Sequence, residues 1–349
     1  MEKSTTNYGV KTKKLSGSMM EILATVPAEI FDGYRGEALK RIGKDVELPG
    51  FRKGHVPEKM LATRIGEVNI LEEMAELAIS RAYAEIIIGE NIDALGRPQV
   101  QITKIAPGNP LEFTLTTAVF PEVKLADYKK IAATIAKRKE PAEVTDEDIE
   151  KTIAQVKRMR AQNEATRDGK EFDEKAPLPE LDEEFVKTLG AYEDVADFNK
   201  KLRADIIVQK EREVRDKVRV AIMEELIKES AIELPEIIVE QELHRMEDEF
   251  GHEVGRMGLT LDSYIKATGK TKEEMRAEWK PDAEKRAKVQ LITSKIAEVE
   301  NLQPQKEEVE REGTLLRQQY PDASLERVDS YITMLLTNEN VFKFLEVAE

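Results

Sequence analysis

Cysteine is absent from this chain of 349 residues, which excludes disulfide bonds, thiolate catalysis and cysteine-ligated metal sites. No apolar run approaches the 18 or so residues that a membrane span needs, and the polar residues 1–14 are not followed by an apolar stretch of secretory length. We therefore expect a cytoplasmic protein with no membrane partner.

Aromatic residues are scarce, at 5% of the chain, whereas charged residues make up 35%. The cores must then be mainly aliphatic, and the charge-rich segments favour long helices with solvated faces over a compact all-β protein. The length suits two or three domains.

Catalytic and metal-binding patterns are also lacking. Of the three histidines, His244 and His252 are eight residues apart, which is not the spacing of four that places two imidazoles on one metal, and His55 lies alone in a loop. The sequence Gly269-Lys270-Thr271 imitates the end of a phosphate-binding loop without its first glycine. We expect no cofactor, no metal and no catalytic residue.

What the chain does contain is a loop at residues 48–57, with two glycines, two prolines, an aromatic ring and two adjacent cations. Glycine and proline at this density exclude an ordinary helix or central strand. Phe51 beside Arg52 and Lys53 is typical of a docking tip for a surface that is partly phosphate and partly apolar. The alternative is a plain surface turn in which Phe51 folds back onto its own domain.

The charge distribution supports the docking tip. The chain has a net charge of −15, which argues against general nucleic-acid binding. Residues 35–64, however, carry eight cations and four anions. A basic tip on an acidic body would orient the protein on RNA without letting it coat RNA.

Periodicity predicts an α+β domain over residues 1–125. Apolar residues alternate in residues 18–27, 98–105 and 111–120, which indicates strands, and helical patterns cover residues 28–42 and 57–90. The loop lies between these two helical segments.

The motif Gly-Phe-Arg-x-Gly-x-x-Pro within the loop resembles the ribosome-binding signature of the trigger factor family, a bacterial chaperone family. Its residues here are Gly50, Phe51, Arg52, Gly54 and Pro57. The resemblance extends over nearly the whole chain, through residues 121–131, 178–185, 234–243 and 295–302. It implies an N-terminal ribosome-binding domain with a small antiparallel sheet and an elongated all-α C-terminal chaperone domain with projecting arms.

One part of the family pattern is missing. Family members usually carry an FKBP-type prolyl isomerase domain after a helix that we place at residues 145–165, where Thr145 and Asp148 resemble a capping box. Here about ten residues lead directly into residues 178–185, so we expect the isomerase domain to be absent. Residues 126–177 are predicted to be an extended linker to about residue 144, followed by that helix.

Residues 178–349 are predicted to form a helical client-binding domain. Long helices are expected at 194–229, after Pro235, after a cap at Thr271, at 283–299, at 305–320 and at 324–349. Flexible methionines and aromatic rings on these helices suit a surface that accepts many sequences, although such residues are more often core. The candidates are Met223, Met246, Phe250, Met257, Met275 and Trp279.

The resemblance implies an ATP-independent chaperone that docks at the ribosomal exit tunnel and binds nascent or unfolded polypeptides. Phe51, Arg52 and Lys53 would contact exit-site protein L23 and adjoining rRNA, while Gly50, Gly54 and Pro57 fix the shape of the loop. A weak homodimer is also expected. Two alternatives are a prolyl isomerase chaperone, which the missing domain disfavours, and a holdase or assembly scaffold that works without the ribosome.

Overall fold

The computed structural model describes residues 8–44, 46, 51, 56–138, 141–169, 173, 177–320 and 323–347. The chain divides into two compact units, Met1–Lys124 with Ser230–Ile292, and Leu125–Glu229 with Thr293–Glu349. The break between Lys124 and Leu125 lies next to the domain boundary predicted near residue 125. The segment predicted as one helical domain, 178–349, is instead shared between the units.

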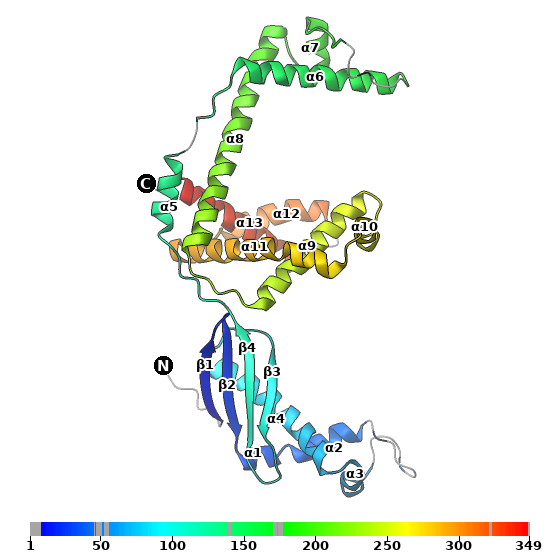
Figure 1. Ribbon diagram of the computed structural model, residues 1–349, viewed down its shortest axis with the longest axis vertical. Helices are drawn as coiled ribbons and strands as arrows, with labels where there is room; N and C mark the ends of the chain where they lie inside the picture. Colours follow the sequence, from blue (N-terminus) through cyan, green and yellow to red (C-terminus); the bar gives the residue numbers. More distant parts are fainter. Residues whose placement is uncertain are drawn as a thin grey trace. The chain divides into compact units, whose positions relative to one another are not determined.

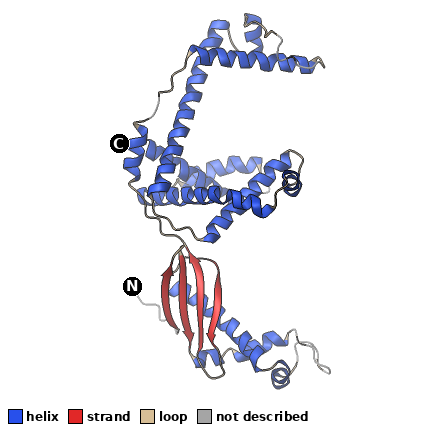
Figure 2. Ribbon diagram, viewed as in Figure 1, coloured by secondary structure: helices blue, strands red, loops and turns tan. Residues whose placement is uncertain are grey.

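The first unit contains a four-stranded antiparallel sheet, drawn in red in Figure 2, whose strand order is β1-β2-β4-β3 (Figure 1). Its strands are β1 (Gly9–Leu15), β2 (Met19–Val26), β3 (Ala94–Lys104) and β4 (Leu111–Val119). The three predicted strands are confirmed, and β1 is an addition. Alternation places the buried side chains of Ile22 and Ala24 on the same face as Leu115 and Phe113, their partners on β4.

Helices cover that face of the sheet. They are α1 (Ala28–Asp32), α2 (Arg35–Gly43), α3 (Glu58–Ile65) and α4 (Glu67–Gly89). Figure 1 shows α4 lying across the sheet, where Ile70, Met74 and Ile86 join the sheet residues in one core. Each predicted helix is divided in two, the second of them at Gly66, whose φ of 84° interrupts the helical backbone.

Three further helices belong to the first unit in whole or part: α9 (Glu236–Arg256), α10 (Leu261–Thr268) and α11 (Lys272–Glu300). Val239, Leu243 and Ala283 form a small core between α9 and α11. The predicted cap is confirmed, since Thr271 accepts a bond from the backbone N–H of Glu274. The prediction of two separate helices beyond it is wrong, because α11 continues through Pro281.

The segment before α9 is bound to the sheet. The backbone N–H of Gly17 donates to the Glu233 carboxylate at 2.7 Å, and the Ser18 hydroxyl donates to the Glu233 carbonyl at 2.7 Å. Lys124 and Ala231 exchange both backbone hydrogen bonds, at 3.1 Å each. These bonds join residues 230–237 to the end of the sheet.

In its described residues the second unit consists of helices and the loops that join them, with no strand. Its helices are α5 (Tyr128–Ala136), α6 (Asp146–Arg167), α7 (Glu183–Leu189), α8 (Val195–Glu229), α12 (Lys306–Gln319), α13 (Leu325–Glu346) and the end of α11. The long α8 contacts α5, α6 and α7, and α13 packs against α5 and α12. The long helix predicted at 194–229 is confirmed as α8.

Two details of this unit bear on the predictions. The capping box at Thr145 and Asp148 is confirmed. The prediction of an extended linker to about residue 144 is wrong for residues 128–136, which form α5. Asp127 begins this helix by accepting a bond from the backbone N–H of Lys130.

Ion pairs hold α8 against its neighbours. Lys210 lies 2.5 Å from Asp148 of α6, and Arg219 lies 2.9 Å from Glu339 and 2.5 Å from Glu346 of α13. The hydrogen bond from Lys210 holds the pKa of Asp148 well below its usual range.

Among the described helices, none combines the length and the apolar composition that crossing a bilayer requires.

Candidate functional site

The predicted docking loop connects α2 to α3. Phe51 keeps 37% of its surface exposed, whereas Val46 and Val56 at the two ends of the loop pack against the N-terminal core. Pro57 forms the N-cap of α3 with a φ of −58°. The remaining predicted loop residues, Gly50, Arg52, Lys53 and Gly54, lie outside the described residues, as does His55.

The cations near this loop are partly neutralised. Arg35 lies 2.5 Å from Glu67, and Arg41 lies 3.0 Å from both Glu73 and Glu76. The hydrogen bond from Arg35 lowers the pKa of Glu67. Sequence counting could not reveal this compensation, because the carboxylates come from α4, outside the basic window. Four exposed cations of the window have no ion pair within the described part of the chain: Lys40, Lys44, Lys59 and Arg64.

The predicted client-binding residues are divided between the two units. Met223 on α8, in the second unit, is only 5% exposed. The other five belong to the first unit, where the Phe250 and Trp279 rings meet edge to face with centroids 5.3 Å apart. Met246 and Trp279 pack against the core of α9 and α11, and Met275 is buried as well. Met257, at the end of α9, is 65% exposed.

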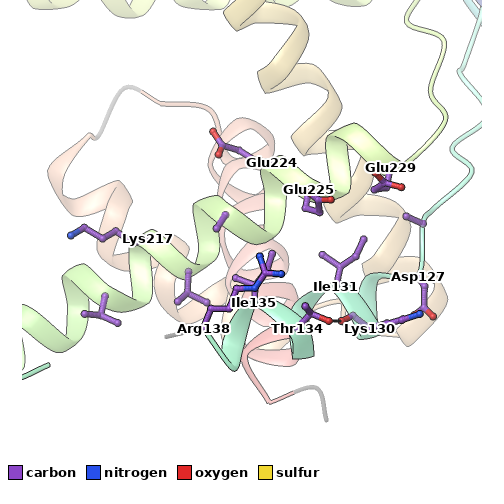
Figure 3. Close-up of a pocket in the computed structure, with 14 residues that line it drawn as sticks. Asp127, Lys130, Ile131, Thr134, Ile135, Arg138, Lys217, Glu224, Glu225 and Glu229 are labelled. Atoms are coloured by element: carbon purple, nitrogen blue, oxygen red, sulfur yellow. Dashed lines mark hydrogen bonds between the residues drawn. The ribbon is translucent and has the colours of Figure 1, made fainter. Parts of the chain in front are cut away.

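A groove of about 860 Å³ lies between α5 and α8 in the second unit (Figure 3). Its floor is apolar. Ile131 and Ile135 are four residues apart on α5, so they share one face of that helix. Facing them are half-buried residues of α8, namely Val214, Val218 and Ala221.

The rim of the groove is charged. Asp127, Glu225 and Glu229 lie toward one end, as Figure 3 shows, and Arg138 and Lys217 toward the other. Glu224 and Lys130 also line the groove. Lys228, which lies between these two glutamates in the sequence of α8, is 3.2 Å from Glu225 and 3.5 Å from Glu229. An apolar floor between charged rims can bury short apolar segments while leaving their polar flanks in water.

The helix α5 is fixed in place at its first turn. The Tyr128 hydroxyl donates to Glu300 at 2.6 Å, and the Lys129 ammonium lies 2.8 Å from the same carboxylate. Burial, and then the bond to Glu300, raises the pKa of Tyr128 to about 12. One wall of the groove is therefore anchored by a hydroxyl that stays protonated.

The sequence contained a signal for this groove that the extended-linker prediction overlooked. Asp127 is a favourable N-cap residue, and Ile131 and Ile135 have helical spacing.

A second, smaller hollow of about 300 Å³ between α6 and α7 is lined by Met159, Leu189 and Arg160, among others. Within the described residues, no cluster of three histidine or carboxylate side chains is placed to hold a metal ion.

Comparison with known families assigns both parts of the chain. Residues 9–156 match the model for "Bacterial trigger factor protein (TF)", and residues 194–345 match that for "Bacterial trigger factor protein (TF) C-terminus". The chain belongs to the trigger factor family. Only residues 157–193 lie between the matched regions, too few for a separate domain of usual size. The prolyl isomerase domain is therefore absent, as the sequence predicts.

Individual relatives agree. The trigger factor of Shouchella clausii (strain KSM-K16) is 26% identical over 421 aligned positions, which cover 97% of this chain and 93% of that protein. The trigger factor of Bacillus pumilus (strain SAFR-032) is also 26% identical, covering 89% of this chain and 92% of the relative. The 421 positions exceed the 349 residues of this chain, so the first relative contains segments that this trigger factor lacks.

The fold matches a solved structure described as "Promiscuous Substrate Recognition in Folding and Assembly Activities of the Trigger Factor Chaperone", with a TM-score of 0.56. The match covers 98% of this chain and 100% of that one, at 16% identity. The α+β class and the helical C-terminal part predicted from the sequence are thus confirmed as the fold of a trigger factor.

Proposed function

We propose that this trigger factor is an ATP-independent chaperone that docks at the ribosomal exit tunnel and binds nascent or unfolded polypeptides. The observation that carries the proposal is the exposed Phe51 ring, in a loop whose two ends are packed against the core of its domain. Such a loop can present an apolar ring to another surface without unfolding. Family membership and the groove between α5 and α8 support the client-binding half.

The proposed docking contact is Phe51, Arg52 and Lys53 against exit-site protein L23 and adjoining rRNA, with Gly50, Gly54 and Pro57 fixing the shape of the loop. Burial of one phenylalanine contributes about 1.5–3 kcal/mol. Each charge-assisted hydrogen bond adds about 1.5–3 kcal/mol, and association costs offset part of the sum. The contact is therefore no tighter than micromolar, about −8 kcal/mol, which allows cycling on and off the ribosome.

Co-sedimentation with empty bacterial ribosomes tests the docking contact. The unaltered protein is expected to pellet with ribosomes at moderate salt, and a variant with Phe51→Ala, Arg52→Ala and Lys53→Ala is expected to stay in the supernatant. A control matched in charge is Lys200→Ala with Arg212→Ala, which removes two exposed cations from α8. Equal pelleting of the triple variant and the unaltered protein would refute this contact and point to another ribosome-binding surface, whereas pelleting of neither protein would favour a ribosome-independent holdase.

The proposed client surface includes the α5–α8 groove and the apolar side chains predicted on the helices, with Met257 the most exposed of them. Met223, Met246, Phe250, Met275 and Trp279 contribute mainly by packing in this conformation. Client release would follow from weak contacts and from folding of the client, so no cofactor is involved. A cytoplasmic location and a weak homodimer complete the proposal.

A further inference from the structure

The groove between α5 and α8 has ends of opposite charge. At one end, Asp127, Glu224, Glu225 and Glu229 outnumber Lys130 and the neighbouring Lys228. At the other end, the lining charges are Arg138 and Lys217. Because α5 and α8 run antiparallel along the groove, the N-cap of α5 meets the last turn of α8.

The apolar floor lies mainly between these ends. It comprises Ile131 and Ile135 on one wall and Val218 and Ala221 on the other, and Val214 extends it three residues beyond Lys217. On α8, Lys217 is eight residues from Glu225 and twelve from Glu229, which corresponds to about 12–18 Å along the helix axis at about 1.5 Å per residue. An extended peptide covers that distance with about four to six residues at about 3.3 Å each.

We propose that this groove binds a short extended polypeptide segment with a cationic residue at one end, an apolar centre and an anionic residue at the other. The inference rests on the proposed client binding, and it specifies which segments of a client the groove selects. The cation of the segment lies among the glutamates of α8, its apolar residues lie on the floor, and its carboxylate lies beside Lys217 and Arg138. The opposite charges of the two ends therefore fix the direction of the segment.

Charge arrangement, rather than charge content, is what the groove recognises. Two six-residue peptides of identical composition separate these properties: one with lysine first and glutamate last around four alternating leucines and serines, the other with lysine and glutamate adjacent in the middle. Both bury the same leucines. Only the first peptide can place each charge at the complementary end.

The test is fluorescence anisotropy of the two labelled peptides with the full chain. At 50 mM salt the first peptide is expected to bind about fivefold more tightly, as two exposed ion pairs would give. The difference is expected to vanish at 500 mM salt, where exposed charges are screened. Equal affinities at 50 mM salt would overturn the inference.

Charge reversal at the basic end locates the effect. Arg138→Glu with Lys217→Glu makes both ends acidic, so the preference between the two peptides is expected to disappear and a peptide with lysine at each end becomes the tightest. The matched control is Lys200→Glu with Arg212→Glu, two exposed residues of α8 outside the groove lining that change the net charge equally. A preference that persists in the groove variant would also overturn the inference.

Three other outcomes bear on this inference and on the proposed function. Binding of a denatured protein with no preference between the peptides refutes the selectivity of the groove and leaves client binding intact. Failure to bind either peptide or denatured protein refutes both. If the groove variant changes the sedimentation coefficient of the protein instead of its peptide affinity, a second copy of the chain occupies the groove and the inference is wrong.

Discussion

At the scale of single residues, Glu247 is a buried and multiply paired charge of the first unit. Its side chain is buried on α9, yet it accepts a hydrogen bond from Arg276 at 2.5 Å and lies 3.2 Å from Lys272. Burial alone would raise the pKa of Glu247, but these bonds more than offset it and the pKa is lowered. A carboxylate with a lowered pKa stabilises the fold in its charged form.

We predict that Glu247→Gln lowers the free energy of unfolding by about 1–3 kcal/mol at pH 7, because Arg276 loses a buried partner. The stabilisation by the charged Glu247 is fully present above the pKa of glutamate in the unfolded chain, about 4.3. It is lost as the pH falls from there through the lowered pKa of the folded state. Urea unfolding at pH 7 and pH 3 measures both effects, with Glu253→Gln, an exposed change on the same helix, as the control. An equal loss of stability at both pH values would contradict this role for the charge.

The sequence around Phe51 predicts the exposure of its ring but not the net charge of the surface nearby. Its exposure followed from the glycines and prolines around it, since they exclude a helix or central strand. The neutralisation of Arg35 and Arg41 did not follow from the sequence, because it depends on how α2 packs against α4. Local composition predicts a loop, whereas the net charge around the loop depends on tertiary contacts.

At the scale of elements, Gly96 marks where β3 meets the first turn of α9. Its φ is 72°, and an added Cβ atom would overlap the Cδ1 atom of Ile237. Gly96→Ala should therefore destabilise the protein by about 1–2 kcal/mol for the left-handed backbone and by a smaller amount for the overlap, because Cδ1 is the end of a rotatable, half-buried side chain. Gly108, with a φ of 65° and no neighbour within 4 Å, supplies the backbone cost alone.

Chemical denaturation of Gly96→Ala, Gly108→Ala and the double variant Gly96→Ala with Ile237→Val separates the two costs. We expect Gly96→Ala to be the least stable, and Ile237→Val to recover part of its loss because valine lacks the overlapping atom. If Gly96→Ala and Gly108→Ala are equally stable and valine restores nothing, Ile237 does not pack against β3.

The elements that the sequence did not predict have physical reasons. The strand β1 contains Lys11, Lys13 and Lys14, so its alternation is weak, and it forms at the sheet edge by pairing with β2. Lysines at such an edge also discourage pairing with other chains. Helix α5 is only nine residues long, and its packing against α8 and α13 stabilises it beyond what its own propensity gives.

At the scale of the whole molecule, the long helices and the missing isomerase domain were predictable, whereas the division into two units was not. Apolar residues recur at helical spacing in two stretches of α8, 195–206 and 214–226, and the missing domain shows as a gap in the family pattern. The grouping of residues 230–292 with the N-terminal sheet depends on contacts such as Gly17 to Glu233. Contacts between residues more than two hundred positions apart leave no periodic signal in the sequence.

Because the isomerase domain is absent, we predict that this protein has chaperone activity but does not catalyse prolyl isomerisation. We expect it to reduce the light scattering of a denatured client on dilution, because apolar segments bind to it before they meet each other. In the refolding of a client limited by proline isomerisation, the slow phase lasts about 10–100 s at 25 °C, and we expect its rate constant to be unchanged.

Both assays use the same client under the same conditions, and a known prolyl isomerase serves as the positive control for the slow phase. Client binding can itself slow refolding, so the rate is measured at several ratios of protein to client and extrapolated to zero protein. A rate constant that increases in proportion to the amount of protein would contradict the prediction and assign isomerase activity to residues outside the missing domain. Suppressed scattering with an unchanged slow phase is the result expected of a trigger factor that holds its clients without catalysing their isomerisation.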